Sequence, residues 1–322
     1  MKNYRNNPLI SVLVPVYNCA DFLDDCITSI VSQDYRPFQL ILANDGSTDG
    51  SLEICRRYAS KYDFIEVLTG PNQGVASTRN KLLDNAIGEY LLFVDADDWI
   101  EPGTLSCLYE IISSKNSDIA VCAPKRANSD FKSVVDVWGK EKTIKEFLKH
   151  KKISGALWNK LIRRSLIEGE RFRKDIFYGE DALFVWKILQ RVGSVAVSNL
   201  PLYNYRPNMQ SLSRQNWTPE KKGTGHFVWA EICKDAESWW PEIVDIAYAR
   251  YAQEDMWALY FASLCGYKKD SHIRLRQDNI RKHLSSLKKY KLDGFSKYLT
   301  AWLLCRCYSL GIIFRIADKY KK

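Results

Sequence analysis

Long apolar runs, paired cysteines and histidines are scarce in this chain of 322 residues. No run of about 18 uncharged apolar residues occurs, which argues against a simple membrane span. The nine cysteines form no CxxC pair and only four histidines are present, so neither a zinc ribbon nor a disulfide framework is indicated. Scattered thiols of this kind suit a reducing cytoplasm. Residues 1–8 are polar and lack the apolar core of a signal peptide, so we expect a cytoplasmic protein.

Two common nucleotide-binding motifs are also missing. No GxGxxG follows the first predicted strand and no GxxxxGK[ST] occurs, so the sequence does not indicate a dinucleotide-binding or a P-loop protein. Hydrophobic residues make up 46% of the chain, an ordinary share for a globular protein, which excludes a disordered or collagen-like chain. The length fits one large domain with an appendage, or two domains.

The positive charge is concentrated at one end of the chain. Residues 266–322 contain fifteen Lys and Arg against four Asp, a net charge of +11, whereas the whole chain carries +9. A basic tail of this kind can hold nucleic acid, or it can be a solvated helical face. The basic character is therefore a property of the C-terminal segment rather than of the whole protein.

Strands and helices are predicted to alternate through the first 122 residues. Apolar, β-branched runs typical of buried strands lie at residues 9–16, 38–43, 64–68, 90–94 and 118–122. Helical spacing predicts helices between them, including one that opens at Pro102 and ends near Ser114. Such alternation predicts βαβ units and a mainly parallel α/β sheet.

Polar residues follow three of these predicted strands. In a parallel sheet, ligands bind outside the carboxyl ends of the strands, where we expect Pro15–Asn18, Asn44–Asp49 and Asp95–Asp98. Three carboxylates within Asp95–Asp98 are costly unless something neutralises them. A divalent cation such as Mg²⁺ or Mn²⁺ does so with one or two carboxylates and phosphate oxygens from a substrate. The simpler alternative is that Asp97 and Asp98 cap the helix near Pro102.

Asp45 lies in the loop after the second predicted strand. A carboxylate there can accept the imide N–H of a uracil or the amino group of another base. The segment Asp45–Ser47 can also be a tight turn with local hydrogen bonds, and the residues alone favour the turn.

Five motifs occur in order along the chain: Val14–Asn18, Asn44–Asp49, Asn72–Asn80, Gly88–Asp98 and Gly179–Asp181. Together they resemble the family 2 glycosyltransferases with the GT-A fold that build bacterial surface polysaccharides, over residues 8 to about 215. The resemblance implies a GT-A domain at residues 1–215 and leaves residues 216–322 as a helical, basic C-terminal region. One departure is Asn44, which stands where many members carry the first of two aspartates.

The resemblance also implies an activity. It is an inverting, metal-dependent transfer of a sugar from a nucleotide diphosphate sugar, with a UDP-sugar favoured, to a hydroxyl of a lipid-linked glycan acceptor. The resemblance implies Mn²⁺ or Mg²⁺ as the cofactor, with Asp97 and Asp95 as its ligands. The residues implied to bind the donor are Pro15, Tyr17, Asn18, Asp45, Arg79, Asp95 and Ala96. For Tyr17 and Arg79, the alternatives are core packing and a surface charge.

Glu180 and Asp181 immediately precede a strong helical pattern at residues 182–189. Inverting glycosyl transfer needs a carboxylate that takes the proton of the attacking hydroxyl, and the first turn of a helix stabilises an ionised carboxylate. The resemblance assigns the catalytic base to Asp181, with Glu180 positioning the acceptor or the base. The alternative is an ordinary helix cap.

Two further segments resemble parts of the family. Trp158 is predicted to stack on an acceptor sugar, or equally to be core, and Lys160 to contact an acceptor or a phosphate. Residues 203–206 and 211–213 resemble a loop that folds over the donor diphosphate. Some members place a metal-binding histidine in that loop, whereas this chain has Asn208 there, which weakens any third protein ligand.

The C-terminal residues 297–322 combine aromatic and aliphatic side chains with Arg306 and Arg315. This pattern fits a helix in the interface of an anionic membrane, and a buried helix or a homo-oligomer contact explains it as well. We therefore expect a glycosyltransferase at the inner face of the cytoplasmic membrane that binds no nucleic acid. The competing hypotheses are an inactive nucleotide-sugar-binding protein, a nucleic-acid binder acting through the tail, and a sugar-nucleotide pyrophosphorylase.

Overall fold

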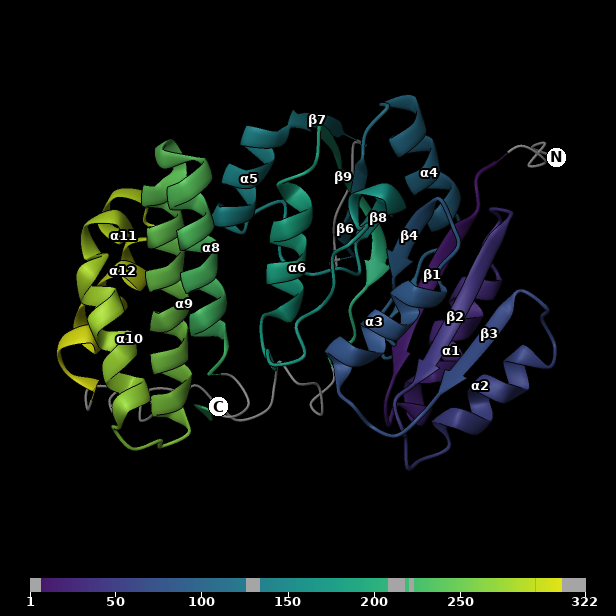
Figure 1. Ribbon diagram of the computed structural model, residues 1–322, viewed down its shortest axis with the longest axis horizontal. Helices are drawn as coiled ribbons and strands as arrows, with labels where there is room; N and C mark the ends of the chain where they lie inside the picture. The colour runs from purple at the N-terminus through teal and green to yellow at the C-terminus, as the bar shows by residue number, and fades with distance from the viewer. Residues whose placement is uncertain (1–6, 126–133, 208–217, 220–222, 293, 309–322) are drawn as a thin grey trace. The chain divides into compact units, whose positions relative to one another are not determined.

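The computed structural model describes residues 7–125, 134–207, 218–219, 223–292 and 294–308, which form two compact units (Figure 1). The first unit comprises Met1–Ile144, Gly155–Lys174 and Phe184–Asn208. The second comprises Lys145–Ser154, Asp175–Leu183 and Met209–Lys322. This division differs from a single boundary after residue 215, because two short earlier segments belong to the second unit.

Contacts within the second unit explain where these two segments belong. The ring of Phe147 stacks on Trp229 of α8 (Gly225–Trp239) with a centroid separation of 6.0 Å. The backbone of Tyr178 forms two hydrogen bonds with the side chain of Thr224, just before the same helix. Both segments therefore pack with a helix that is distant in sequence, which a pattern of local periodicity does not reveal.

The first half of the sheet is parallel, as the alternating pattern predicts. The strand order is β3-β2-β1-β4, with bounds Ile65–Thr69, Phe38–Asn44, Ile10–Val16 and Tyr90–Phe93. Nearly every side chain of β1 and β2 is buried, as expected for strands covered on both faces. Because β2, β1 and β4 are parallel neighbours, the loops that follow them leave the same edge of the sheet.

The second half of the sheet is mixed. β8 (Lys160–Arg163) is antiparallel to β4 and to β6 (Ile119–Pro124), and β6 is parallel to β9 (Ser194–Asn204). β9 is antiparallel to β5 (Trp99–Ile100) and β7 (Val135–Gly139). The parallel arrangement therefore covers the half β3-β2-β1-β4, and beyond it the described strands have one further parallel pair, β6 with β9. Neighbouring strands run parallel when a crossover connection, usually a helix, joins them. Beyond residue 122 the chain no longer alternates strand and helix at the spacing of βαβ units.

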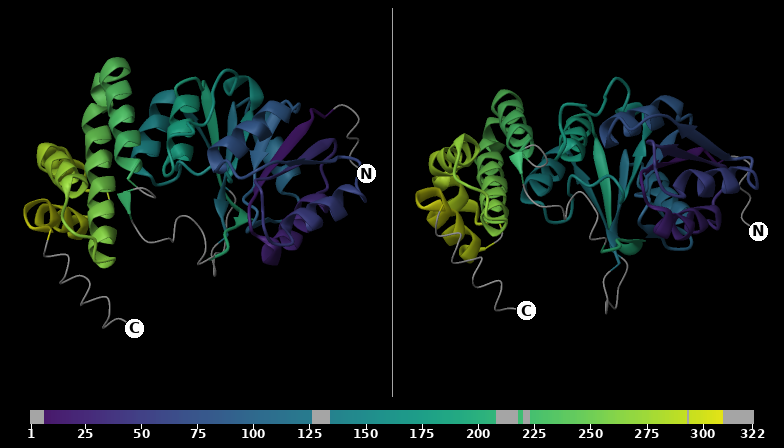
Figure 2. Two further views of the ribbon diagram at one scale, coloured as in Figure 1. Left: turned by 60° about the horizontal axis from the view of Figure 1, so that its bottom comes forward. Right: turned by 90° about the horizontal axis from the view of Figure 1, so that it is seen from below.

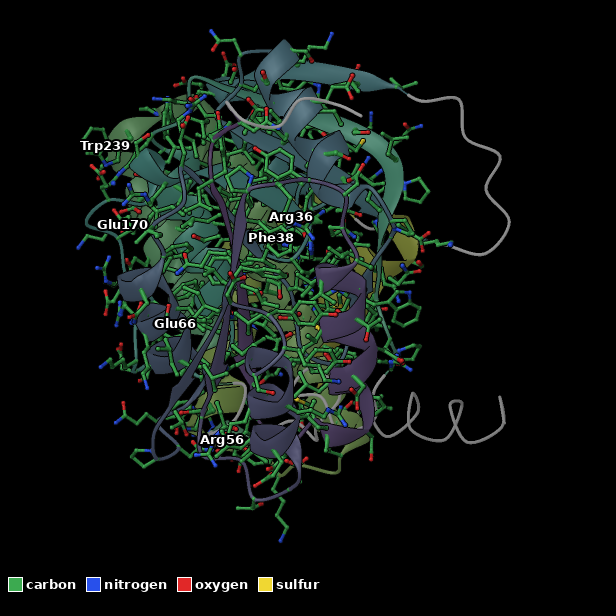
Figure 3. All side chains as sticks on the ribbon, turned by 90° about the vertical axis from the view of Figure 1, so that its right-hand side faces the viewer. Arg36, Phe38, Arg56, Glu66, Glu170 and Trp239 are labelled. Carbon is green, nitrogen blue, oxygen red and sulfur yellow. The ribbon has the colours of Figure 1, made fainter. Side chains whose placement is uncertain are left out.

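Helices accompany the sheet along the described part of the chain. They are α1 (Ala20–Val31), α2 (Ser51–Ala59), α3 (Val75–Asn85), α4 (Thr104–Ser114), α5 (Lys140–Lys149), the 3₁₀ turn η1 (Arg164–Leu166) and α6 (Glu180–Leu189). α4 begins at Thr104 rather than at Pro102, because Gly103 before it takes a left-handed conformation with φ +76°. Before β2, the guanidinium carbon of Arg36 lies 4.6 Å from the Phe38 ring centroid (Figure 3).

The second unit is helical, as predicted for the C-terminal region. After α8 follow η3 (Pro241–Ile243), α9 (Val244–Leu264), α10 (Ser271–Lys282), α11 (Leu284–Tyr290) and α12 (Phe295–Arg306). Helices α10, α11 and α12 pack against α9 (Figure 2). Their shared core contains Met256 and Leu259 of α9, Ile280 of α10 and Leu304 of α12.

Helix α12 contains the described part of the predicted membrane-facing stripe. Leu304 is fully buried, whereas Trp302 and Leu299 are 37% and 43% exposed. Residues 309–322, which include Phe314 and Arg315, lie outside the described residues. Among the residues that are described, no helix combines the length and the apolar character that crossing a bilayer requires. The stripe is therefore partly core and partly surface.

None of the nine cysteines forms a disulfide. In the first unit, Cys19, Cys26, Cys55 and Cys122 are buried, and burial raises the thiol pKa of each, to about 12 for Cys19. Cys107 is half-buried, and burial raises its pKa as well. The exposed cysteines are Cys265 and Cys307, both in the second unit.

Candidate functional site

Asp45, at the end of β2, joins two loops of the predicted site. Its Oδ1 accepts the N–H of Gln73 and its Oδ2 accepts the N–H of Gly74, both at 2.9 Å. Gly74 has φ +85° and immediately precedes α3, so the carboxylate fixes the turn that starts this helix. Asp45 as a whole residue is 9% exposed. The carboxylate therefore fixes a loop about 28 positions away rather than a local turn of its own segment, and each oxygen retains a second lone pair for a ligand donor.

The loops after β1 and β2 are joined by side-chain hydrogen bonds. The Asn18 N–H donates to Ser47 Oγ at 3.1 Å, and its Oδ1 accepts the N–H of Thr48 at 2.8 Å. Asn18 has φ +45°, a conformation that asparagine tolerates better than most residues. Beside it, Tyr17 is 51% exposed, so it is a surface residue rather than core. Pro15 is half-buried in β1, in register with Ala43.

Asn44 is the residue that differs from the family pattern, in which many members have an aspartate. It is 4% exposed, and its Nδ2 donates to Thr69 Oγ1 of the neighbouring β3 at 3.3 Å. Its Oδ1 is buried and has no hydrogen-bond partner among the described residues. The amide therefore links two strands at this edge of the sheet.

Arg79 of α3 is directed towards the acidic turn after β4. Its Nη2 lies 3.9 Å from Asp95 Oδ1, and its guanidinium carbon lies 5.5 Å from the Phe172 ring centroid. The arginine side chain is 11% exposed, so it is not the surface charge of the alternative interpretation. An arginine held here between an aromatic ring and a carboxylate supplies a fixed positive charge at the predicted donor site.

The carboxylates after β4 divide into two kinds. Asp95 and Asp97 are half-buried, whereas Asp98 is 1% exposed. Asp98 Oδ2 accepts the Tyr203 hydroxyl and its Oδ1 accepts the Arg206 N–H, each at 2.7 Å. Burial raises the pKa of Asp98 to about 7, although both hydrogen bonds oppose that change. Ala96 between them is buried in the core, so its methyl group is not presented to a ligand.

Arg206 holds this acidic turn from outside. Its Nε donates to the Asp97 carbonyl at 3.0 Å, and its Nη2 donates to Asp25 at 2.7 Å. Its guanidinium carbon also lies 4.7 Å from the Trp99 ring centroid and 5.1 Å from that of Phe22. Through these contacts, residues 203–206 hold the Asp95–Asp98 turn in place. Asn208 and residues 211–213, predicted to continue this loop, lie outside the described residues.

Asp95 and Asp97 fit a hard divalent cation by their chemistry. Both place carboxylates at the end of β4, whereas Asp98 is committed to Tyr203 and Arg206. Over the described ranges, no group of three or more His, Cys, Asp or Glu side chains gathers to hold a metal. One or two carboxylates with substrate phosphate oxygens are the usual protein contribution to an Mg²⁺ site. The donor set is thus compatible with a metal that the substrate helps to bind.

Glu180 and Asp181 begin α6 and belong to the second unit. Asp181 Oδ1 accepts the N–H of Ala182 at 2.7 Å, and Asp181 is half-buried. Glu180 is 9% exposed. Gly179, with φ +88°, makes the turn into the helix. Both carboxylates therefore lie in the first turn of a helix, where the sequence predicts them.

Trp158 and Lys160 were predicted to contact an acceptor. The Trp158 ring is half-buried and stacks on Tyr203, with centroids 4.4 Å apart. Lys160 is 1% exposed, and its Nζ donates to Ala156 O and to Asn159 Oδ1. These contacts favour the core alternative for Trp158 and give Lys160 an internal role. The sequence missed that role because a lysine side chain usually reaches solvent.

Comparison with known proteins identifies the family. Residues 11–169 match the model of glycosyl transferase family 2, so this part of the chain is a domain of that family. The match contains the first four of the five motifs, and the Glu180–Asp181 pair lies beyond it.

Two curated relatives illustrate the similarity. The cholesterol galactosyltransferase of Borreliella burgdorferi is 35% identical over 63% of this chain and 62% of its own. The glycosyltransferase GlyA of Streptococcus pneumoniae is 33% identical over 78% of this chain and 36% of its own. The chain thus matches less than two thirds of the length of these relatives.

A solved structure shares the fold. The crystal structure of S. aureus TarS 1–349 in complex with UDP superposes with a TM-score of 0.66 at 20% identity, covering 97% of this chain and 92% of that one. The predicted fold class, an α/β GT-A domain with a C-terminal helical region, is confirmed.

Proposed function

We propose that this protein transfers a sugar from a nucleotide diphosphate sugar to a hydroxyl group of a glycan acceptor. The observation that carries the proposal is the edge where β1, β2 and β4 end, because it gathers Tyr17, Asp45 and the Asp95–Asp97 turn. TarS, which shares the fold, has been solved with UDP and with UDP-GlcNAc, and this supports a UDP-sugar as the donor. The sugar is a hexose or an N-acetylhexosamine.

Within this proposal, Tyr17 and Asp45 bind the base, and Arg79 neutralises the diphosphate. Asp97 and Asp95 hold Mn²⁺ or Mg²⁺, which when bound stabilises negative charge on the leaving diphosphate. A mannosyltransferase of Pyrobaculum calidifontis with a TM-score of 0.52 was solved with GDP-Man and Mn²⁺. The carboxylates of this chain are suited to the same type of ion.

The chemical step needs a base as well. The acceptor oxygen attacks the anomeric carbon as the bond from that carbon to the diphosphate oxygen breaks, and the hydroxyl proton passes to Asp181. Attack from the face opposite the leaving group inverts the anomeric configuration. The first turn of α6 favours the ionised form of Asp181 that this role requires.

The acceptor and the location form the finer part of the proposal. The net charge of +11 over residues 266–322 and the exposed Trp302 and Leu299 favour a reversible contact with an anionic membrane. Such a contact brings the enzyme to a lipid-linked acceptor at the cytoplasmic face of the membrane, where surface polysaccharides are built.

A panel of nucleotide sugars with Mn²⁺ tests the activity. We expect one donor to be hydrolysed slowly, to raise the thermal midpoint and to be transferred to a glycan acceptor. Asp181→Asn should leave donor binding unchanged and lower kcat by about 10²–10⁴-fold. Normal turnover of Asp181→Asn together with an inactive Glu180→Gln would exchange the two roles. No thermal protection by any nucleotide sugar would refute the proposal.

A further inference from the structure

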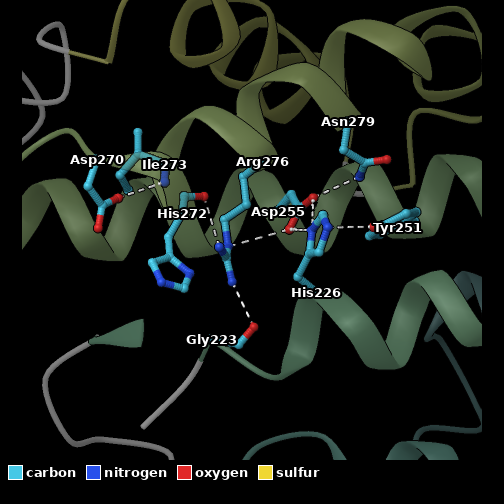
Figure 4. A network of polar contacts seen from close by, with 9 residues as sticks. All are labelled: Gly223, His226, Tyr251, Asp255, Asp270, His272, Ile273, Arg276 and Asn279. Carbon is cyan, nitrogen blue, oxygen red and sulfur yellow. Dashed lines mark hydrogen bonds and ion pairs between the residues drawn. The ribbon is translucent and has the colours of Figure 1, made fainter. Parts of the chain in front are cut away.

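The turn at residues 223–225, before and at the start of α8, is held by a buried arginine of the same unit. Arg276 Nη2 donates to Gly223 O at 2.8 Å, and its Nη1 donates to His272 O at 2.9 Å (Figure 4). Arg276 Nε lies 3.6 Å from Asp255 Oδ1, and both residues are 1% exposed. A buried ion pair is stable only while both charges stay compensated, so Arg276 is held beside Asp255. Its Nη2 in turn fixes the position of the Gly223 carbonyl.

Asp255 is itself held by two further helices. Its carboxylate lies 2.8 Å from His226 Nδ1 of α8 and accepts Asn279 Nδ2 of α10 at 2.7 Å. His226 Nε2 lies 2.8 Å from the Tyr251 hydroxyl of α9. Figure 4 shows that the contacts converge on Asp255. The network therefore ties α8, α9 and α10 to the turn before α8.

On its other side, the turn holds the segment that carries the acidic pair. The Tyr178 N–H donates to Thr224 Oγ1 at 2.9 Å, and Thr224 Oγ1 donates to Tyr178 O at 3.1 Å. One hydroxyl thus fixes both peptide groups of Tyr178. A Cβ at Gly225 would lie 3.2 Å from the Tyr178 ring, so the close approach depends on a glycine there. Two residues after Tyr178, α6 begins at Glu180.

We propose that Thr224 is a positioning residue for the segment that presents Glu180 and Asp181, and that the Asp255–Arg276 network holds Thr224 in place. This proposal rests on the role assigned to Asp181 above. Thr224 acts through the backbone of Tyr178 and contacts neither carboxylate in the hydrogen bonds described. All the residues concerned belong to the second unit, so the helical region has a part in catalysis.

Thr224→Val tests the proposal, because it removes the hydroxyl and keeps the shape of the side chain. We expect faster amide hydrogen exchange in residues 175–183, a kcat for transfer lowered about 10- to 100-fold, and a donor KM within about twofold of wild type. Thr224→Ser should restore both exchange and kcat. Thr224→Ala removes the same hydroxyl without a new methyl group, and it is measured in parallel in case valine is not accommodated.

Thr300→Val is the matched control. Its hydroxyl donates to Ser296 O within α12, so its loss should change neither residues 175–183 nor kcat. Unchanged exchange at residues 175–183 in both Thr224→Val and Thr224→Ala would overturn the proposal, whichever residue is the base. Faster exchange with a normal kcat would overturn it too.

A double variant separates this proposal from the assignment of the base. If Thr224 acts through Asp181, adding Thr224→Val to Asp181→Asn should lower kcat by much less than the product of the two single effects. Fully multiplicative losses would overturn the link to Asp181. Normal turnover by Asp181→Asn alone would refute the proposed base, while the exchange experiment would still decide whether Thr224 anchors the segment.

Discussion

The Tyr203 hydroxyl donates to Asp98 Oδ2 at 2.7 Å, although 105 positions separate the two residues in the chain. The same hydroxyl accepts the N–H of Asp95 at 3.1 Å. One phenol of β9 therefore contacts the first and the last carboxylate residue of the acidic turn. The position of Asp95 and Asp97 depends on this contact, because it fixes the backbone from which both side chains project.

Tyr203→Phe should lower the free energy of unfolding by about 1–3 kcal/mol, because the buried Asp98 Oδ2 loses the donor that Tyr203 supplies, while Oδ1 keeps the Arg206 N–H. It should also weaken Mn²⁺-dependent UDP binding, measured by calorimetry. The matched control is Tyr35→Phe, which removes a hydrogen bond to Pro8 O in the same unit. Equal losses of UDP affinity in the two variants would contradict the role given to Tyr203.

Asp45→Asn should destabilise the loop before α3. An amide places one donor against the N–H of Gln73 or Gly74, so one hydrogen bond is lost, at a cost of about 1–2 kcal/mol. We expect a lower thermal midpoint and at least about tenfold weaker UDP binding. Asp84→Asn, which removes a surface ion pair with Arg171, is the control. Wild-type UDP affinity in Asp45→Asn would exclude Asp45 from base binding.

Metal dependence follows from Asp95 and Asp97. EDTA should abolish transfer, and Asp97→Ala should remove both activity and the Mn²⁺-dependent part of UDP binding. Calorimetry with and without Mn²⁺ measures the second effect independently of turnover. Full activity of Asp97→Ala, or full activity of the wild type in EDTA, would refute the metal assignment.

Membrane contact is tested by co-sedimentation with vesicles. The protein should bind anionic but not neutral vesicles, and high salt should weaken binding. Replacing Leu299 and Trp302 with glutamine should reduce binding, whereas donor hydrolysis should persist. Leu275→Gln, an exposed apolar residue of α10, is the control. Equal binding to neutral vesicles, or none to either kind, would refute the membrane proposal.

His283 gives the second unit a dependence on pH. Burial lowers its pKa from 6.5 to about 4, so the unfolded state holds the proton more tightly than the folded state. This contribution to stability is complete above about pH 6.5 and should decline by about 2–3 kcal/mol as the pH falls to about 4. His283→Phe retains stacking on Tyr248, whose ring centroid lies 4.1 Å from that of His283, and should flatten the decline in chemical denaturation. An unchanged slope would contradict this assignment.

The sequence predicted β1 to β4 and their loops because each strand is largely apolar, with Glu66 interrupting β3, and is bounded by turn residues. It did not predict β8, where Leu161 and Ile162 stand between charged residues and resemble no isolated strand signal. Among the carboxylates, Asp97 and Asp98 are identical neighbours in the sequence. They differ in exposure because Tyr203 of β9 contacts Asp98. The spacing of residues around Asp97 and Asp98 does not predict a contact with such a distant residue.

The same limit applies to the second unit. The sequence placed Glu180 and Asp181 at a helix start, because the apolar pattern of α6 begins directly after them. It did not predict that Thr224 would form hydrogen bonds with Tyr178, two residues before Glu180, since a threonine before a helix normally indicates only a cap. Contacts between distant segments are therefore what the structure adds to the candidate site.

The distribution of the cysteines has a practical consequence for spectroscopy. Since Cys265 and Cys307 are the exposed thiols and those of the sheet unit are buried or half-buried with raised pKa values, maleimide dyes at neutral pH should react first with the helical unit. Replacing one of the two with serine would leave a single attachment point for a fluorophore. Such a probe would monitor the helical unit during turnover, while the carboxylates at the ends of β2 and β4 remain chemically untouched.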